Sequence, residues 1–148
     1  MGANDGMLHG FNATNGAEVL AYVPSMVYAN LPRLTAKNYN SNHRYFVDGT
    51  PDIQDVCLSP NTTAPYNCAA ATSWSTMLVG SLGAGGQGIF ALDVTAPATF
   101  SEANASSIAK WEFTGADDPD LGNVTSQPLI RRMANGRFAA IVSGGYNN

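Results

Sequence analysis

An internal repeat constrains the fold of this 148-residue chain more than any other feature of its sequence. The segment Leu8 to Val23 has the same order of apolar runs and turns as the segment Ile89 to Thr114. A second pair repeats too, because Val47 to Val56 aligns with Val124 to Met133. Self-similarity of this kind is the signature of repeat architectures. The chain is therefore expected to contain tandem copies of one small structural unit.

A third repeated pair completes the unit, since Trp74 to Gly80 aligns with Phe138 to Gly144. The runs are short, rich in β-branched and aromatic residues, and separated by turn residues, which predicts strands. Asn135-Gly136 between two runs is a strong hairpin signal. Only Ser25 to Arg44 lacks a strand pattern, and a helical turn or surface loop is expected there. The expected strands are Met7–Phe11, Glu18–Val23, Tyr45–Val47, Ile53–Val56, Trp74–Leu82, Gly88–Val94, Ala109–Thr114, Pro128–Met133 and Phe138–Ser143.

Four antiparallel strands per repeat favour a β-propeller over a β-sandwich, which does not need strand pairs to recur in register. We expect an all-β, partial propeller of about two four-stranded antiparallel blades. The blade-like units are placed roughly at 1–56 and 74–133, with a further partial blade to 148. Because a closed ring typically has about 4–8 blades, the chain is interpreted as an incomplete piece of one propeller domain. Its unpaired outer strands predict self-association of the chain alone.

The composition excludes several classes of function. Net charge is −4 and the seven basic residues are scattered, so nucleic acid is not an expected partner. No apolar run reaches the roughly 18 residues of a membrane span. The first five residues have neither a basic start nor an apolar stretch, so no signal peptide is predicted. Charged residues make up only 12% of the chain, and neutral polar residues replace them, as in many extracellular β-proteins.

Cys57 and Cys68 are the only cysteines, and their spacing fits no zinc pattern. Two interpretations stay open: a local disulfide, or two unrelated buried thiols. The disulfide is favoured because the loop Leu58 to Asn67 is polar and contains proline, so it is expected to be exposed and to let its ends meet. A disulfide here would place the protein in an oxidising compartment, the periplasm or the exterior.

The glycine-rich run Gly83 to Gly88 fits the pattern of a dinucleotide-binding loop, but that site requires a helix to follow. The run is followed by a strand-like segment, Ile89 to Val94, so a β-turn is favoured. Asp117, Asp118 and Asp120 are close together, yet they lack the alternating ligands of a calcium loop. A solvated turn is favoured there over a weak cation site.

The histidines and aromatic residues are interpreted structurally. His9 is expected to be a hydrogen-bonded strand residue, and His43 has no nearby serine or cysteine with which to form a catalytic group. Packing between blades explains the aromatic side chains within the expected strands, which are Trp74, Phe90, Trp111, Phe113 and Phe138. No catalytic, cofactor-binding or metal-binding residue is predicted, and the chain is not expected to be an enzyme.

Several blocks of the chain resemble successive blocks of the propeller domain in PilC-type tip-associated proteins of bacterial type IV pili. The blocks are GANDGMLHGFNATNGAE (2–18), HRYFVDGTP (43–51), MLVGSLGAGGQGIFALDVT (77–95), WEF followed by DPDLG (111–122) and SGGYNN (143–148). The resemblance implies one part of a seven-bladed propeller in a large secreted protein at the pilus tip. It implies a role in pilus assembly, retraction control and surface adhesion.

The resemblance also implies partners and a cofactor. The partners are pilus components, a host or abiotic surface, and the remaining blades of the same propeller. The calcium loop of the family is expected downstream of residue 148, so no cofactor is expected within the chain. An alternative is a fragment of a quinoprotein-like propeller enzyme or of an envelope assembly scaffold. The enzyme would need a cofactor-stacking tryptophan, a set of calcium ligands and a catalytic aspartate, and none of these is assigned here.

Overall fold

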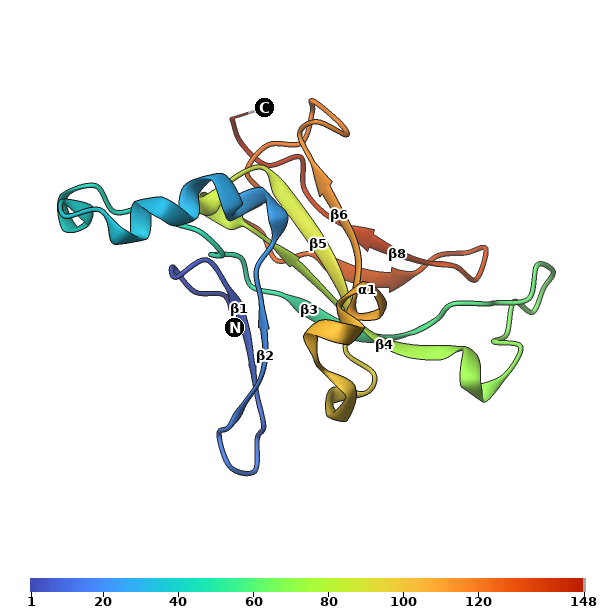
Figure 1. Ribbon diagram of the computed structural model, residues 1–148. Coiled ribbons are helices and arrows are strands. Elements are labelled where there is room, and N and C mark those ends of the chain that lie inside the picture. Colours follow the sequence, from blue (N-terminus) through green and yellow to red (C-terminus); the bar gives the residue numbers. More distant parts are fainter. Residues whose placement is uncertain (148) are drawn as a thin grey trace.

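A computed structural model of the chain describes residues 1–147 as eight β-strands in three antiparallel sheets (Figure 1). The first sheet pairs β1 (Leu8–Phe11) with β2 (Glu18–Tyr22). The central sheet has the order β3 (Asp52–Cys57), β4 (Trp74–Ser81), β5 (Gly88–Asp93) and β6 (Ala109–Thr114). The last sheet pairs β7 (Leu129–Arg132) with β8 (Phe138–Ile141). The expected all-β, antiparallel and unclosed fold is confirmed.

Short helical segments fill the connections. The longest is the 3-10 helix η1, and the only α-helix among residues 1–147 is the single turn α1. None of the helices in this part of the chain is long and apolar enough to cross a membrane. The segments are η1 (Ser25–Thr35), η2 (Tyr39–Ser41), η3 (Ala71–Ser73), η4 (Gly83–Gly85), η5 (Pro97–Thr99), η6 (Glu102–Asn104) and α1 (Ala105–Ile108).

The central sheet is built around the hairpin of β4 and β5. Met77 lies opposite Asp93 and Ser81 lies opposite Ile89, and the glycine-rich run forms the turn between the strands. The first five residues of β5 are buried, whichever face of the sheet they point to. A strand covered on both faces needs apolar residues at successive positions rather than an alternating pattern. The run GIFAL meets this requirement.

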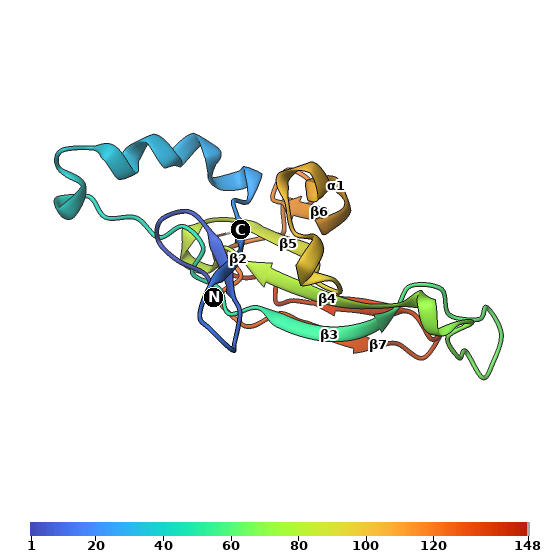
Figure 2. The same ribbon diagram turned by 60° about the horizontal axis from the view of Figure 1, so that its bottom comes forward.

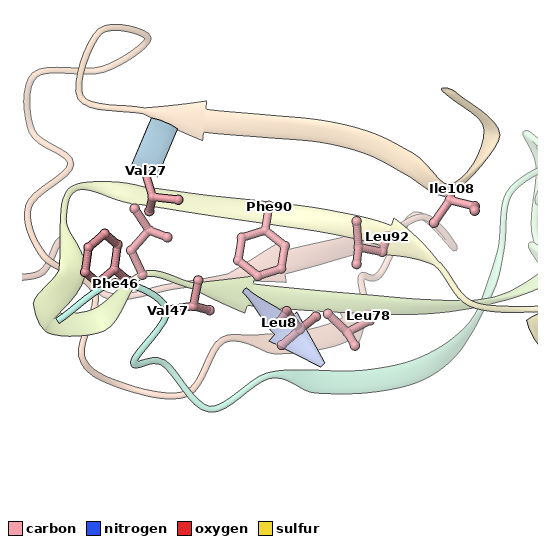
Figure 3. Packing of buried hydrophobic residues seen from close by; sticks show 9 residues of the cluster. Leu8, Val27, Phe46, Val47, Leu78, Phe90, Leu92 and Ile108 are labelled. Atoms are coloured by element: carbon pink, nitrogen blue, oxygen red, sulfur yellow. The ribbon is translucent and has the colours of Figure 1, made fainter. Parts of the chain in front are cut away.

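One face of the central sheet packs against the N-terminal part of the chain (Figure 3). Phe90 and Leu92 of β5 point toward Leu8 of β1, and Val27 of η1 lies over the same cluster. The Tyr22 ring lies 5.2 Å from the Phe90 ring. The largest core of the molecule therefore joins β1, β2 and η1 to the central sheet.

The opposite face of the central sheet packs against β7 and β8. Val79 and Ala91 are buried there together with Ile130 of β7, and Phe138 of β8 packs against them. Figure 2 shows β7 lying along β3 on this side, while η1 projects from the other side. The two clusters make a three-layer arrangement, in which the central sheet is covered by a strand pair on each face.

The strands reproduce the sequence repeat, but the sheets begin at a different point of the repeat. Residues 1–56 and 74–133 were expected as separate units, whereas β3 pairs along its whole length with β4 and belongs to the sheet that spans 52–114. A side-chain hydrogen bond also recurs at equivalent positions of the repeat. The Asn12 side chain accepts a hydrogen bond from the Thr14 amide at 2.8 Å, and Asp93 accepts one from the Thr95 amide at 3.1 Å.

One expected strand is wrong. Tyr45–Val47 forms no ladder, because its amides bond irregularly to the turn before β1: Phe46 N–H donates to the Asn4 side chain at 3.2 Å and Val47 N–H to the Ala3 carbonyl at 3.3 Å. Phe46 and Val47 are both buried although they are neighbours. A strand at a sheet edge would bury only alternate residues. The predicted Asn135-Gly136 hairpin is confirmed, with Gly136 in the left-handed region at φ 81°.

Candidate interaction surface

Two exposed segments project from the sheets. The first is 25–44, which holds η1 and η2 and projects from the body of the molecule in Figures 1 and 2. It is anchored by Val27, which is buried, and by Met26 and Leu31, which pack against the core. The Tyr28 side chain is exposed on the same helix. The expected helical turn is confirmed. Its apolar side chains fix the segment to the core, and its polar and aromatic side chains are exposed.

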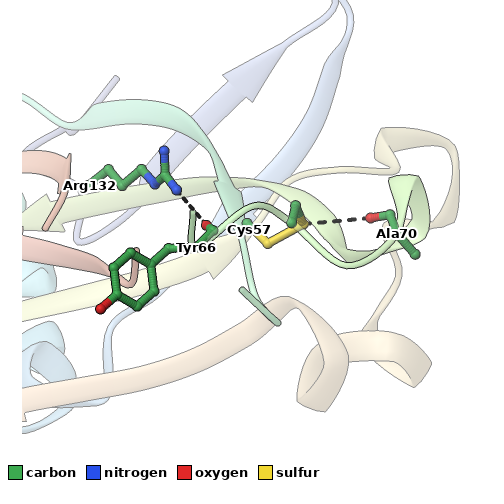
Figure 4. Close-up of a disulfide and its surroundings, with 5 residues drawn as sticks. Cys57, Tyr66, Ala70 and Arg132 are labelled. Atoms are coloured by element: carbon green, nitrogen blue, oxygen red, sulfur yellow. Dashed lines mark hydrogen bonds between the residues drawn. A yellow bond between two sulfur atoms is a disulfide. The ribbon is translucent and has the colours of Figure 1, made fainter. Parts of the chain in front are cut away.

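The second projecting segment is the loop between β3 and β4, which we call the cysteine loop (residues 58–73). The structure joins Cys57 to Cys68, with their Cα atoms 5.7 Å apart, within the range of disulfides (Figure 4). Arg132 of β7 donates a hydrogen bond to the Tyr66 carbonyl. A Cβ atom on Gly136 would crowd Tyr66, so glycine at this hairpin tip lets the loop lie against it. The loop is thus held by the disulfide and by the contacts of Tyr66 with the β7 and β8 hairpin.

A groove of about 690 Å³ lies between the cysteine loop and the face of the central sheet that carries Trp111. Its floor is apolar, and its rim carries the side chains of Asn61, Asn135 and Arg137. Trp111 is 41% exposed, so part of its side chain is open to a partner. Exposed aromatic side chains next to polar groups are typical of interaction sites.

A second groove, of about 720 Å³, lies between β2 and β6 and contains Glu112. The Glu112 carboxylate accepts hydrogen bonds from the Tyr22 hydroxyl at 2.6 Å, from the Ser25 amide at 2.8 Å and from the Ser25 hydroxyl. Burial raises the pKa of Tyr22, and the hydrogen bond with Glu112 raises it further. No sequence pattern pointed to Glu112 as a functional residue. Its only local signal is one acidic residue between the aromatic residues Trp111 and Phe113.

His9 lies between two carboxylates on the first sheet. Its Nε2 atom is 2.9 Å from an Asp5 oxygen, and its Nδ1 atom contacts Glu18. The hydrogen bond with Glu18 raises the pKa of His9, burial lowers it, and Asp5 raises it again, so the net pKa is raised from 6.5. The prediction of a hydrogen-bonded strand histidine agrees with these contacts. Protonated His9 joins β1, β2 and the turn before β1.

We expect the unfolding free energy to depend on the protonation of His9. A group whose pKa is raised in the folded state stabilises the fold fully below its unfolded value of 6.5, and this stabilisation is lost as the pH rises through the raised pKa. Urea denaturation across this interval should show stability falling with pH in the wild type, and a smaller slope in His9→Gln. An unchanged slope in His9→Gln would contradict the assignment.

The glycine-rich turn does not have the geometry of a nucleotide site. Strand β5 follows it directly, where a dinucleotide fold would begin a helix. A Cβ atom on Gly85 would overlap the Phe46 carbonyl. The glycine therefore serves the close approach of two backbone segments, and the expectation of a turn is confirmed.

The acidic cluster forms turns. The Asp117 carboxylate accepts hydrogen bonds from the Thr114 amide and hydroxyl at 2.8 and 2.9 Å, and Asp118 accepts one from the Asp120 amide at 2.9 Å.

His43 lies between the rings of Tyr39 and Tyr45, each 5.5 Å away. Within residues 1–147 no three His, Cys, Asp or Glu side chains gather as a metal site. The sequence-predicted residues are thus spread over the fold and form no common centre.

Comparison with known proteins identifies the family. The family model described as the PilY1 beta-propeller domain matches residues 1–148. The chain belongs to the PilY1 β-propeller family. It is 40% identical over 149 residues to the type IV pilus biogenesis factor PilY1 of Pseudomonas aeruginosa strain PAO1, and 41% identical over 148 residues to a PilY1 homolog of Xylella fastidiosa. The expected relationship to type IV pilus propeller proteins is confirmed.

The fold of the PilY1 family is also seen in a solved structure. The crystal structure of the Pseudomonas aeruginosa PilY1 C-terminal domain matches 99% of this chain with a TM-score of 0.67 and 36% sequence identity. The chain covers 24% of that domain. It spans 11% of the Pseudomonas relative and 9% of the Xylella relative. The comparisons therefore place this chain as similar to one part of a much longer protein.

Proposed function

We propose that the chain is a non-enzymatic scaffold and interaction module of a type IV pilus tip protein, with roles in pilus assembly, retraction control and surface adhesion. The observation that carries the proposal is the match to the PilY1 propeller family over residues 1–148. The relatives carry the name of pilus biogenesis factors. The location that follows is the cell surface at the pilus tip, reached through the periplasm.

The mechanism that we propose is presentation of loops on a rigid set of sheets. The cysteine loop and the segment 25–44 are both exposed, and each is fixed by buried or cross-linked residues at its base. Such loops lose little conformational entropy on binding, because the residues at their bases are already fixed. Pilus components or a host or abiotic surface are the partners we propose. The calcium loop implied by the family resemblance stays a prediction for sequence beyond residue 148.

A chimera tests this function. The segment of Pseudomonas aeruginosa PilY1 that aligns with this chain is replaced by residues 1–148, and surface pili are quantified after shearing. We expect the chimera to restore surface pili in a strain that lacks PilY1, and a deletion of the segment to restore none. Attachment to a surface is measured in the same strains. A chimera that accumulates normally yet supports neither pili nor attachment would refute the proposal.

A further inference from the structure

The connection between β2 and β3 contains an insertion relative to the sequence repeat. By the repeat, β2 corresponds to β6 and β3 corresponds to β7. The connection from β2 to β3 has 29 residues (23–51), whereas the equivalent connection from β6 to β7 has 14 residues (115–128). The shorter connection shows how many residues the fold needs to pass from one sheet to the next. Because insertions in repeat proteins often form the binding face, the additional residues of segment 25–44 indicate a role beyond joining two sheets.

The segment is fixed at its base and exposed beyond it. Val27 is buried, and Met26, Leu31 and Leu34 pack against the core. Residues 35–43 are exposed, except for the half-buried Tyr39. The 11 residues of η1 extend over roughly 22 Å, since a 3-10 helix rises by about 2.0 Å per residue. Figure 1 shows the chain running away from the sheets along η1 and returning after η2, so the residues after Leu34 lie away from the core.

The inserted segment is positively charged, whereas the rest of the chain is negatively charged. Segment 25–44 contains Arg33, Lys37 and Arg44 and no acidic residue, which gives it a formal charge of +3. The whole chain carries −4, so the other residues together carry −7. The equivalent connection, residues 115–128, has a formal charge of −3. The positive charge therefore belongs to the insertion and not to this position of the repeat.

The cations of the segment have no acidic partner among residues 1–147. The ion pairs in this part of the chain use the side chains of His9, Lys110 and Arg131. Arg33 and Lys37 are exposed, and Arg44 is half-buried. A surface of one charge sign attracts ligands of the opposite sign and raises their rate of association. The segment is therefore suited to an anionic ligand.

Aromatic rings and amide groups lie beside these cations. The His43 ring is 5.5 Å from each of the rings of Tyr39 and Tyr45, and Tyr45 is 51% exposed. An exposed tyrosine offers a flat apolar face, which can pack against the C–H groups of a sugar ring. Amide side chains donate and accept hydrogen bonds, as sugar hydroxyl groups do. The exposed amide side chains of the segment tip are those of Asn38, Asn40 and Asn42.

We propose that segment 25–44 binds a polysaccharide that carries carboxylate groups, with the cations contacting the carboxylates and the rings and amides contacting the sugars. The inference rests on the proposed function, because it names a ligand class for surface adhesion. A nucleic acid fits less well, since duplex DNA carries one charge per about 1.7 Å of its axis and its binding requires clustered cations. Three cations spaced along 12 residues, 33–44, match a polymer with no more than one carboxylate per sugar.

The test uses the Pseudomonas aeruginosa PilY1 C-terminal domain, with residues 1–148 in place of its aligned segment, so that the remaining blades are present. The probe is a polygalacturonate oligomer in calcium-free buffer, and the control probe is the same oligomer with its carboxylates methyl-esterified. By calorimetry we expect the charged oligomer to bind at least about tenfold more tightly than the ester, and less tightly as salt is raised. Absence of binding, or equal binding of the ester, would overturn the proposal.

Variants of the same chimeric domain locate the site. Arg33→Gln should weaken binding about threefold, in the range of an exposed charge pair, and Arg33→Gln with Lys37→Gln about tenfold. Tyr45→Ser should also weaken binding, because it removes the aromatic face. The matched control is Arg131→Gln, which removes the same charge from β7 and should bind like the unsubstituted domain. Equal losses in Arg33→Gln and Arg131→Gln would show that net charge and not segment 25–44 determines binding.

Two further probes distinguish a polysaccharide from other polyanions. A single-stranded DNA oligonucleotide and phosphatidylglycerol vesicles should each bind more weakly than polygalacturonate, and tighter binding of either would refute the ligand class. In a strain that lacks PilY1, attachment to a polygalacturonate-coated surface is then measured per amount of surface pili. It should fall in the chimera with Arg33→Gln and Lys37→Gln. An unsubstituted chimera that restores no pili contradicts the proposed function, whereas equal attachment of the two chimeras contradicts only the polysaccharide site.

Discussion

Replacing Phe90 with alanine should cost about 3–5 kcal/mol of unfolding free energy, which is the usual cost of removing a buried phenylalanine side chain. Phe90 is fully buried at the centre of the largest cluster, where it contacts the layer formed by β1 and β2. Its ring also lies so close to Gly80 of β4 that a Cβ atom there would crowd it. Small domains are stable by only about 5–15 kcal/mol, so the variant should be largely unfolded at modest urea concentrations.

The matched control is Phe11→Ala, which removes the same side chain from a position that is 52% exposed. We expect a cost of less than about 1 kcal/mol, in the range of surface substitutions away from a core. Both variants are compared by urea denaturation followed by tryptophan fluorescence, at concentrations below those of any association. Equal losses in the two variants would mean that the layer of β1 and β2 does not pack against β5 as described.

Removing the disulfide should cost about 3 kcal/mol. In the loop-entropy model, joining residues 11 positions apart restricts the unfolded chain by roughly this amount. Cys57 ends β3 and Cys68 lies in the cysteine loop, so the loss should be accompanied by higher amide exchange in residues 58–73. The measurement is chemical denaturation of the Cys57→Ser, Cys68→Ser double variant beside the wild type, with and without reductant.

Two observations distinguish a disulfide from a loss of side-chain packing. The reduced wild type should match the double variant, and the double variant should be insensitive to reductant. Titration of free thiols in unreduced, denatured protein should detect none. Two reactive thiols in such material would mean that Cys57 and Cys68 do not form a disulfide.

Local sequence patterns predicted the strands because each depends on residues close together in the chain. The apolar run of β5 and the turn residues before it require only a hairpin, and they formed one with β4. The Asn135-Gly136 pair likewise determined the hairpin of β7 and β8. The Gly83 to Gly88 run was interpreted correctly because the strand-like residues that follow cannot begin a nucleotide-binding helix. The backbone conformation of these turns and strands is determined by residues that are neighbours in the sequence.

The residues of the candidate interaction surface were harder to predict from the sequence. Glu112 contacts Tyr22 and Ser25, which lie about ninety positions earlier in the chain, and no local pattern reports such a partner. The groove beside Trp111 exists only because the cysteine loop folds toward the β7 and β8 hairpin. Both depend on contacts between distant segments.

The sequence by itself determined that the chain is built from repeated antiparallel strand pairs, and its blocks indicated the family. Only the tertiary structure decided where each sheet begins, and it assigned β3 to the sheet of β4, β5 and β6. It also decided that residues 45–47 form no strand, because their amides bond to one side chain and one carbonyl of the turn before β1 rather than to a strand. The reason is that a repeat in the sequence defines the length of the repeating unit but not the strand at which each sheet begins. Which strand edges meet depends on hydrogen bonds and apolar packing between pairs, and every pair is chemically able to join the one before it or the one after it.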